Sequence, residues 1–209
     1  ARKREERLSE VPVSATAMTA ERLASEGITN GVQLFQRVPG VQITNSGNEV
    51  NSVIQIRGGG SGRLSDNNTE PATGLYRNGA YLGGGTLGGL TLGPLDYFDV
   101  ERIEIFRGPQ AATFGRNATA GAVNVVSRKP GRDFGGEAQA TLSDPGAASG
   151  QFVVNLPLSD AWATRLGFRY ARQWDGFVDN SLTGESLEKS RFAGGRASLA
   201  GPTQDNPDS

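Results

Sequence analysis

The stretch VERIEIFRGPQAATFGRNATAGAVNVVSRKP, residues 100–130, decides the fold of this chain. It begins with β-branched residues that alternate with charged ones from Val100 to Phe106, a pattern that predicts a short strand. Gly108-Pro109 ends the strand, because proline has no backbone donor for a ladder. A loop of small residues follows, and an almost wholly apolar run from Ala122 to Val126 predicts a second strand. The stretch is therefore predicted to be a strand–loop–strand unit.

The order of residues in this stretch resembles the plug domain of TonB-dependent outer-membrane receptors. The matching residues are Val100-Glu101-Arg102-Ile103-Glu104, Arg107-Gly108-Pro109-Gln110, Phe114-Gly115-Arg116-Asn117-Ala118-Thr119 and Gly121-Ala122-Val123-Asn124. Two earlier parts resemble the same family, namely LFQRVPGV at 34–41 and the strand ending in Ile56-Arg57-Gly58. An ordinary strand–loop–strand of an α/β domain would not produce this order by chance.

Composition limits the classes of function. The 209 residues suffice for one or two domains with a core, and 21 Lys+Arg nearly balance 22 Asp+Glu, which argues against a nucleic-acid partner. Cysteine and histidine are absent, so disulfides, thiolate metal sites and the commonest general base are excluded. No apolar run of about 18 residues predicts a transmembrane helix, although strands of a membrane barrel would not show as such a run. Because the resemblance implies transport, in which no bond is made or broken, we expect neither enzyme activity nor a cofactor or metal site.

Residues 11–130 are predicted to form the plug, an α+β domain with a small mixed sheet, short helices and long loops. Residues 1–10 are a charged lead-in. Strands are expected at 11–16, 41–44 and 52–57, and as a hairpin at 75–82 around Asn78-Gly79. Helices are expected at 20–25, capped by Thr19, and from Thr29 to Pro39-Gly40. Glycine-rich loops occupy 58–74 and 83–93.

The sequence pattern changes in residues 134–209, where segments alternate between two kinds of residue. The segment from Trp162 to Trp174 is the most informative of them. One face carries Trp162, Thr164, Leu166, Phe168, Tyr170, Arg172 and Trp174, and the other carries Ala163, Arg165, Gly167, Arg169, Ala171 and Gln173. A tilted strand of this length rises roughly 28 Å, close to the apolar band of a membrane barrel. We therefore expect the aromatic face to meet lipid, with Trp162, Tyr170 and Trp174 at the membrane interfaces.

Neighbouring segments alternate in the same way, at 138–142, 151–158 and 191–200. Ser159-Asp160 is predicted to make a tight turn, and longer polar loops are expected at 144–150 and 175–190. Four strands cannot close a barrel, since the smallest need eight and this family uses about twenty-two. The barrel is therefore expected to be incomplete here, and the chain to be part of a longer receptor. Any signal peptide is expected to have been removed already, and the TonB box to lie upstream.

The resemblance also implies functional residues. In plug domains the arginines that correspond to Arg57 and Arg107 pair with glutamates of the barrel wall, and an ion pair within the plug is the alternative. Ligand contacts come from outward-facing loop tips, which fall near Asn45, Ser61, Arg63, Thr86 and Leu87. Arg63 suits an anionic ligand, and an ordinary exposed arginine is the alternative.

Two other sequence patterns do not indicate a cofactor-binding or catalytic site. Gly83, Gly85 and Gly88 match G-x-G-x-x-G, but Leu90-Thr91-Leu92-Gly93-Pro94 cannot open the helix that a dinucleotide site needs. The acidic residues Asp96, Asp99, Glu101 and Glu104 have arginines near them in sequence, and we interpret them as solvated or ion-paired structure.

The implied function is that of a TonB-dependent receptor in the outer membrane of a Gram-negative bacterium, with the plug inside the barrel lumen. It would bind a scarce solute, above all a ferric siderophore, and import it with energy from TonB. The alternative is a soluble periplasmic module, plug-like and with a small β extension. A soluble module should bury Trp162 and Trp174, whereas a barrel strand should expose them to lipid.

Overall fold

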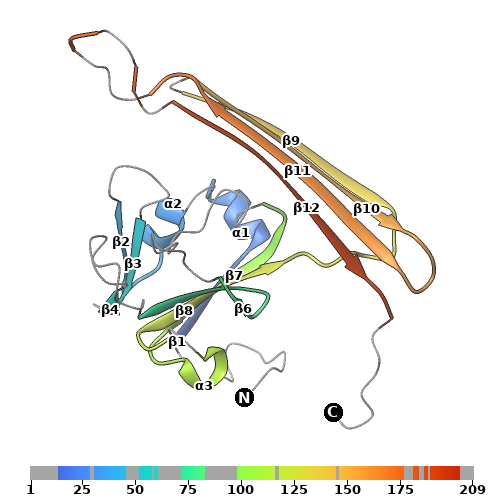
Figure 1. The fold of residues 1–209 in the computed structure, drawn as a ribbon, viewed down its shortest axis with the longest axis horizontal. Helices are drawn as coiled ribbons and strands as arrows, with labels where there is room; N and C mark the ends of the chain where they lie inside the picture. Colours follow the sequence, from blue (N-terminus) through green and yellow to red (C-terminus); the bar gives the residue numbers. More distant parts are fainter. Residues whose placement is uncertain are drawn as a thin grey trace. The chain divides into compact units, whose positions relative to one another are not determined.

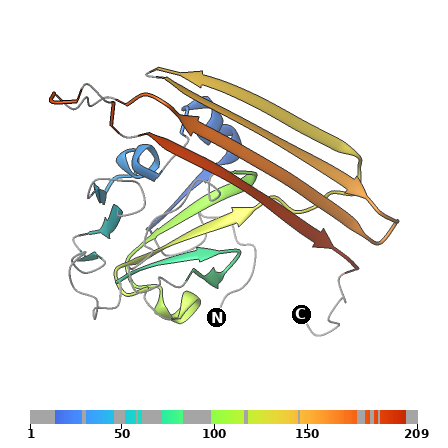
Figure 2. The same cartoon turned by 45° about the horizontal axis from the view of Figure 1, so that its top comes forward.

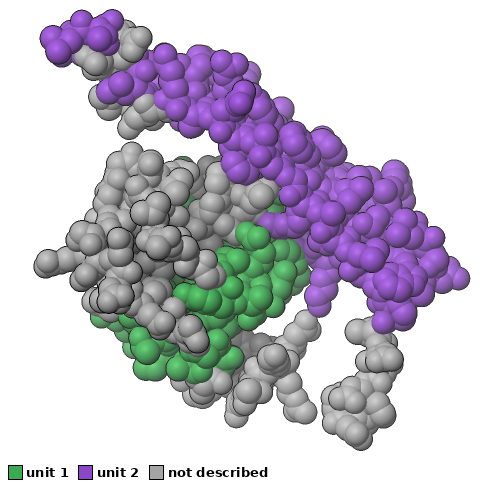
Figure 3. Space-filling view, viewed as in Figure 1, with its two compact units in different colours: residues 1–127 green, residues 128–209 purple. Residues whose placement is uncertain are grey.

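The computed structural model describes residues 14–28, 31–45, 52–57, 59–60, 72–82, 98–115, 118–144, 146–176, 181–183, 186–187 and 189–202. The chain divides into two compact units, residues 1–127 and residues 128–209 (Figure 3). Each unit has its own sheets, which Figure 1 shows in sequence colours. No helix in the described part of the chain is long and apolar enough to cross a membrane.

The main sheet of the first unit has five strands in the order β1-β7-β8-β5-β6. They are β1 (Ser14–Thr19), β5 (Thr73–Arg77), β6 (Ala80–Tyr81), β7 (Val100–Arg107) and β8 (Gly121–Ser127). β5 runs parallel to β8, and the other neighbours are antiparallel, so the sheet is mixed. The predicted strand–loop–strand unit is confirmed as the antiparallel pair β7–β8 at the middle of the sheet.

A smaller sheet and two helices complete the first unit (Figure 1). The sheet consists of β2 (Val41–Asn45), β3 (Ser52–Ile56) and β4 (Gly59–Gly60). Helix α1 (Ala20–Ser25) is capped as predicted, because Thr19 Oγ1 accepts a hydrogen bond from the Arg22 amide at 3.4 Å. Helix α2 (Gly31–Gln36) precedes the Pro39-Gly40 turn. A third short helix, α3 (Ala111–Phe114), lies in the loop between β7 and β8.

Two sequence expectations for this unit are wrong in their bounds. The first strand, expected to end at residue 16, continues to Thr19, because its pairing with β7 runs from Ser14 opposite Arg107 to Thr19 opposite Arg102. Residues 11–13 lie outside the described residues. The expected loop at 58–74 contains β4 and the first two residues of β5, since Thr73 and Gly74 pair with β8.

The core of the first unit joins both helices to both sheets. Its members are buried apolar side chains that include Met18 of β1, Leu23 of α1, Phe35 of α2, Ile54 of β3, Ile103 and Ile105 of β7, and Val123 of β8. A second cluster holds Tyr76 against Ala118 and Ala122, with Phe114 of α3 packed 4.6 Å from the Tyr76 ring. Burial raises the pKa of Tyr76, with Tyr81 as a smaller cause. The apolar sequence run in β8 is thus explained by burial along nearly its whole length.

The second unit is a four-stranded antiparallel sheet in the order β12-β11-β10-β9 (Figure 2). Its strands are β9 (Gly135–Ser143), β10 (Ala147–Pro157), β11 (Ala163–Gln173) and β12 (Ser190–Ala200). The turn predicted at Ser159-Asp160 is confirmed, with the Leu158 amide donating to Trp162 O at 2.8 Å. The loop expected at 144–150 is wrong, because residues 147–150 already belong to β10 and pair with β9.

Candidate functional site

The two predicted arginines end β3 and β7, and the structure brings them to the same corner of the first unit. Arg107 lies at the C-terminal end of β7, where its Nη1 donates to Pro39 O at 3.0 Å and its Nη2 to Thr16 Oγ1 at 3.2 Å. Arg57 follows β3 directly, and its amide donates to Gly40 O at 3.0 Å. The Arg107 side chain and the Arg57 backbone therefore both contact the Pro39-Gly40 turn.

The backbone of this corner is unusual. Arg57 has φ 52°, a left-handed conformation that costs a residue with a Cβ roughly 1–2 kcal/mol. Gly108, next to Arg107, has φ 110°, and a Cβ built on it would lie 3.8 Å from Arg57 Nη1. Backbone strain of the kind retained at Arg57 is typical of functional positions.

No carboxylate pairs with Arg57 or Arg107 in the described parts of the chain. Ion pairs there are formed by other arginines, among them Arg22, Arg37, Arg102 and Arg128. Arg107 Nε is buried and has no acceptor among the described residues, whereas the Arg57 side chain is exposed. The guanidinium of Arg107 thus has two neutral oxygen partners and one unused buried donor.

The predicted ligand-contact positions lie mostly outside the described residues. This applies to Ser61, Arg63, Thr86 and Leu87. Asn45 is the last residue of β2 and pairs with Ser52 of β3. The structure therefore places one of the five positions, at the end of the β2–β3 hairpin.

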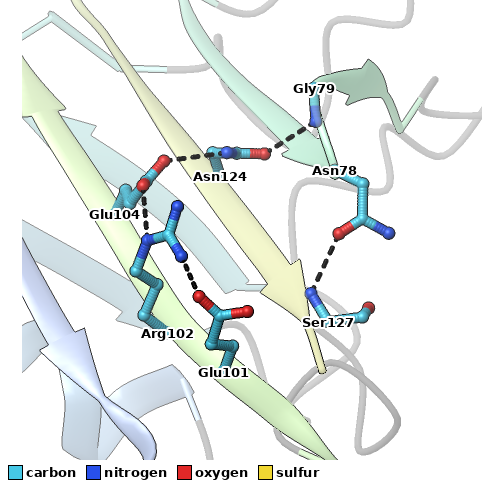
Figure 4. Close-up of polar contacts among 7 residues, drawn as sticks. All are labelled: Asn78, Gly79, Glu101, Arg102, Glu104, Asn124 and Ser127. Carbon is cyan, nitrogen blue, oxygen red and sulfur yellow. Dashed lines mark hydrogen bonds and ion pairs between the residues drawn. The ribbon is translucent and has the colours of Figure 1, made fainter. Parts of the chain in front are cut away.

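A polar network fastens the β5–β6 hairpin to β7 and β8 (Figure 4). Asn124 of β8 donates through Nδ2 to Glu104 at 2.9 Å, and its Oδ1 accepts from the Gly79 amide at 3.0 Å. Arg102 binds Glu104 through Nε at 2.8 Å and also pairs with Glu101. Asn78, the residue before Gly79 in the turn, accepts a hydrogen bond from the Ser127 amide through its Oδ1 at 2.9 Å.

This network explains the acidic cluster of the sequence. Glu101 and Glu104 pair with Arg102, so the interpretation as ion-paired structure is confirmed for these two residues, and Asp96 lies outside the described part. Within the described residues no group of three or more acidic side chains could hold a metal ion. The role of the network is to position the hairpin.

In the second unit, one face of the sheet carries apolar side chains that are exposed. Phe152 of β10 and Phe168 of β11 are direct cross-strand partners with ring centroids 6.0 Å apart, and they are 52% and 40% exposed. Trp162, Tyr170 and Trp174 are 46%, 39% and 48% exposed. This is a contiguous apolar surface of the kind that marks an interaction with lipid or protein.

The opposite face of the same sheet carries polar side chains that contact one another across the strands. Gln151 of β10 donates to Gln139 Oε1 of β9 at 2.8 Å, and its own Oε1 accepts from Arg169 Nη1 of β11 at 3.3 Å. Alternation places these residues on one face, but only the strand register, which aligns Gln139, Gln151 and Arg169 in one row, brings them into contact.

Asn155 is a positioning residue that the sequence analysis did not single out. It lies on β10, is buried, and binds the segment that leads into β9 through three hydrogen bonds. Its Oδ1 accepts from the Gly131 amide at 2.8 Å, and its Nδ2 donates to Gly131 O at 2.8 Å and to Asp133 O at 2.5 Å. No local signal marks this contact, because the partners lie 22 and 24 residues apart in sequence.

Comparison with known families gives one match over the first unit. The family model described as TonB-dependent Receptor Plug Domain matches residues 7–122. The Pesticin receptor of Yersinia pestis is 30% identical over 196 residues, which cover 93% of this chain and 28% of that protein. The Catecholate siderophore receptor Fiu of Escherichia coli K12 is 27% identical over 155 residues, 72% of this chain and 18% of that protein.

Solved structures are similar over both units. The ferric yersiniabactin uptake receptor FyuA from Yersinia pestis has a TM-score of 0.75 and 27% identity, over 91% of this chain and 29% of FyuA. The closed form of the ferric-catecholate import receptor Fiu has a TM-score of 0.71 at 22% identity, over 93% of this chain and 24% of Fiu, and shows likeness of fold. The chain thus spans less than a third of the length of each of these relatives.

Proposed function

The chain belongs to the family of TonB-dependent receptor plug domains, and from this premise we propose that the whole protein imports a ferric siderophore across the outer membrane of a Gram-negative bacterium. The observation that carries the proposal is the family match at residues 7–122, followed by a sheet with an exposed apolar face. TonB supplies the energy, and the transport makes or breaks no covalent bond. Residues 1–10 serve as a lead-in, 11–130 as the plug and 134–209 as the first barrel strands.

The solute class is supported by the relatives. Fiu is described as a catecholate siderophore receptor and FyuA as a ferric yersiniabactin uptake receptor. In this chain the ligand would meet the plug at the loop tips near Asn45, Ser61, Arg63, Thr86 and Leu87. The remaining contacts belong to barrel residues outside this chain.

Arg57 and Arg107 hold the plug to the barrel wall by pairing with glutamates. Support comes from the absence of a carboxylate partner among the described residues and from the buried, unused Nε of Arg107. A buried guanidinium donor without an acceptor is costly, so a partner outside the described residues is expected. The ion pair within the plug, which the sequence left open, has no support in the described part.

The plug closes the pore until ligand binding releases the N-terminal segment to TonB. The double variant Arg57→Gln/Arg107→Gln of the full-length receptor is therefore expected to let a large hydrophilic antibiotic enter cells. Arg22→Gln, which alters an exposed arginine of α1, is the matched control and should not leak. A double variant that stays as tight as the wild type would contradict the role of the two arginines.

The proposed function is tested by uptake of radioactive iron. The full-length gene is expressed in a strain that lacks its own siderophore receptors, and catecholate and other ferric siderophores are offered with and without functional TonB. Uptake of at least one siderophore that disappears without TonB is expected. A product found in the periplasm, with no uptake of any siderophore, would favour the soluble binding module instead.

The exposed apolar face does not favour the soluble module. Trp162 and Trp174 are about half exposed, whereas a soluble sheet of this size should bury its aromatic residues. Under the proposal they mark the two membrane interfaces, with Tyr170 toward the Trp174 end of β11.

A further inference from the structure

Two arginines meet on the apolar face of the second unit, at one end of the sheet. Arg172 of β11 and Arg191 of β12 are direct cross-strand partners, and both are exposed. Leu142 and Ala148 continue the same row on β9 and β10. The pair therefore borders the surface that carries Phe152, Phe168 and Tyr170 rather than the polar face with Arg169.

This pairing is unfavourable within the protein alone. Like charges directly opposite each other destabilise a pair of strands, and here the surrounding face is apolar. Neither arginine makes a hydrogen bond or ion pair with another described residue. Lys189, which is exposed and precedes Arg191 by two residues, adds a third positive charge. The arrangement calls for an anion from outside the chain.

Among the described residues at this end, no acidic side chain supplies that anion. Asp175 accepts a hydrogen bond from the Gly176 amide at 3.2 Å and forms no ion pair with the arginines. Asp144 is exposed and likewise forms no ion pair among the described residues. Trp174 lies at the same end, where its amide donates to Gly146 O at 2.9 Å. The positive pair thus sits at an aromatic boundary of the apolar face.

The connections identify which end this is. The connection from β11 to β12 at the arginine end is long and begins at Trp174. The β10–β11 turn at the other end and the β9–β10 turn at the arginine end are both short. Outer-membrane barrels have short turns on the periplasmic side and long loops outside. Under the proposed function, the arginine pair therefore lies at the level of the outer leaflet.

We propose that Arg172 and Arg191 bind the phosphate group of a phosphorylated glycolipid in the outer leaflet, an inference that rests on the proposed outer-membrane location. Two guanidinium groups present forks of donors that match phosphate oxygens, and Lys189 adds a point charge. The acyl chains of the same lipid lie along the neighbouring apolar face, on Leu142 and Phe152. The phosphate relieves the repulsion between the two arginines.

The test uses the full-length receptor in nanodiscs and bisphosphorylated lipid A as the probe. The variant Arg172→Gln/Arg191→Gln removes two charges at this end. Lys129→Gln/Arg132→Gln is the matched control, because both residues are exposed and precede β9 at the opposite end of the sheet. Binding of lipid A is measured by native mass spectrometry, with dephosphorylated lipid A and inorganic phosphate as further arms.

Lipid A binding by the Arg172→Gln/Arg191→Gln variant is expected to weaken about 10- to 30-fold, while the control binds as the wild type does. Dephosphorylated lipid A should bind the wild type and the variant equally weakly. Wild-type affinity in the variant would overturn the inference and leave the arginines as side chains that reach to interfacial water. If inorganic phosphate bound as tightly as lipid A, the inference that the anion comes from a lipid would be overturned.

Siderophore binding is measured on the same samples, so that a failure of this inference can be distinguished from a failure of the proposed function. Normal siderophore binding with unaltered lipid A binding in the variant would refute this inference alone. Loss of lipid A binding in the variant, in a receptor that binds no siderophore, would support the inference and contradict the proposed function.

Discussion

Strands β7 and β11 alternate apolar and polar residues in the same way, yet they present the apolar face to different surroundings. In β7, Ile103 and Ile105 are fully buried and Glu101 is exposed. In β11, Phe168 and Tyr170 are about 40% exposed, and Arg169 of the other face hydrogen-bonds a neighbouring strand. Periodicity therefore predicts which residues share a face, and the surrounding medium decides which face points outward.

The two units also differ in what stabilises them. The first has a core that joins two sheets and two helices, and its hairpin is fastened by side-chain amides. The second is a single sheet with β9 and β12 at its edges, and an open edge in lipid would leave backbone groups unpaired. The first unit is thus expected to be stabilised by its own core, and the second by lipid and further strands.

The largest effect is expected from a charge in the core of the first unit. Ile105→Asp places a carboxylate at a site with 0% exposure and no partner, which should cost more than about 4 kcal/mol and unfold the plug. Ile105→Val is the matched control and should cost about 1 kcal/mol. Limited proteolysis of the full-length receptor measures the difference, and a plug that resists protease with Asp at this position would contradict a buried β7.

A charge introduced on the exposed apolar face of the second unit should reduce stability less than a charge in the core of the first unit. Phe168→Arg is expected to destabilise the receptor by about 2–4 kcal/mol in a bilayer, because under the proposed function Phe168 lies near the middle of a strand whose aromatic face meets lipid. Ala171→Arg, on the polar face of the same strand, should be within about 1 kcal/mol of the wild type. Urea unfolding from lipid vesicles compares them. Equal costs for the two variants would mean that the two faces do not differ in their surroundings.

A smaller loss of stability is expected when the segment that leads into β9 loses its contacts with Asn155. Asn155→Ala removes three hydrogen bonds and leaves Gly131 and Asp133 without their partner, so a loss of about 1–3 kcal/mol is expected. Amide hydrogen exchange at Gly131 should speed up in the variant, whereas exchange in β7 should not change. Unaltered protection of Gly131 would show that water replaces the side chain at no cost.

The smallest effect concerns pH and the surface of the first unit. Hydrogen bonds from Arg22 and then Arg37 lower the pKa of Glu26 from its ordinary value of 4.5. A lowered folded-state pKa adds stability at pH values above the unfolded pKa, and that stability is lost as pH falls through the folded pKa. Glu26→Gln should remove this pH-dependent contribution to the stability of the first unit. The contribution is small because solvent screens the interaction of the Glu26 carboxylate with the two arginines. Thermal unfolding at neutral and acidic pH, compared with the wild type, measures it.

The sequence predicted most of the first unit because its signals are local. Thr19 caps α1, Asn78-Gly79 makes the hairpin, and the motif residues place β7 and β8. The single-turn helix α3 was not predicted, since four small and aromatic residues have no helical periodicity. The start of β10 was assigned to a loop because Ala148, Ser149 and Gly150 give no alternation of their own.

Contacts of the candidate site that depend on long-range register could not be predicted. Arg107 binds Pro39 across 68 residues, and the left-handed conformation of Arg57 has no marker in its own sequence. The opposition of Arg172 and Arg191 likewise follows from the β11–β12 register, in which a shift by one residue would move Arg191 to the other face.

The central claim is that the first unit is followed by barrel strands whose aromatic face meets lipid, and it is tested most directly with spin labels on neighbouring residues of β11. This chain has no cysteine, so Phe168→Cys and Arg169→Cys can each be labelled singly in the full-length receptor in a bilayer, once any cysteine outside this chain has been replaced. Collisions with oxygen, which concentrates in lipid, should be frequent for the label at 168 and infrequent for the label at 169. The reverse order, or equal shielding of both labels, would contradict the claim.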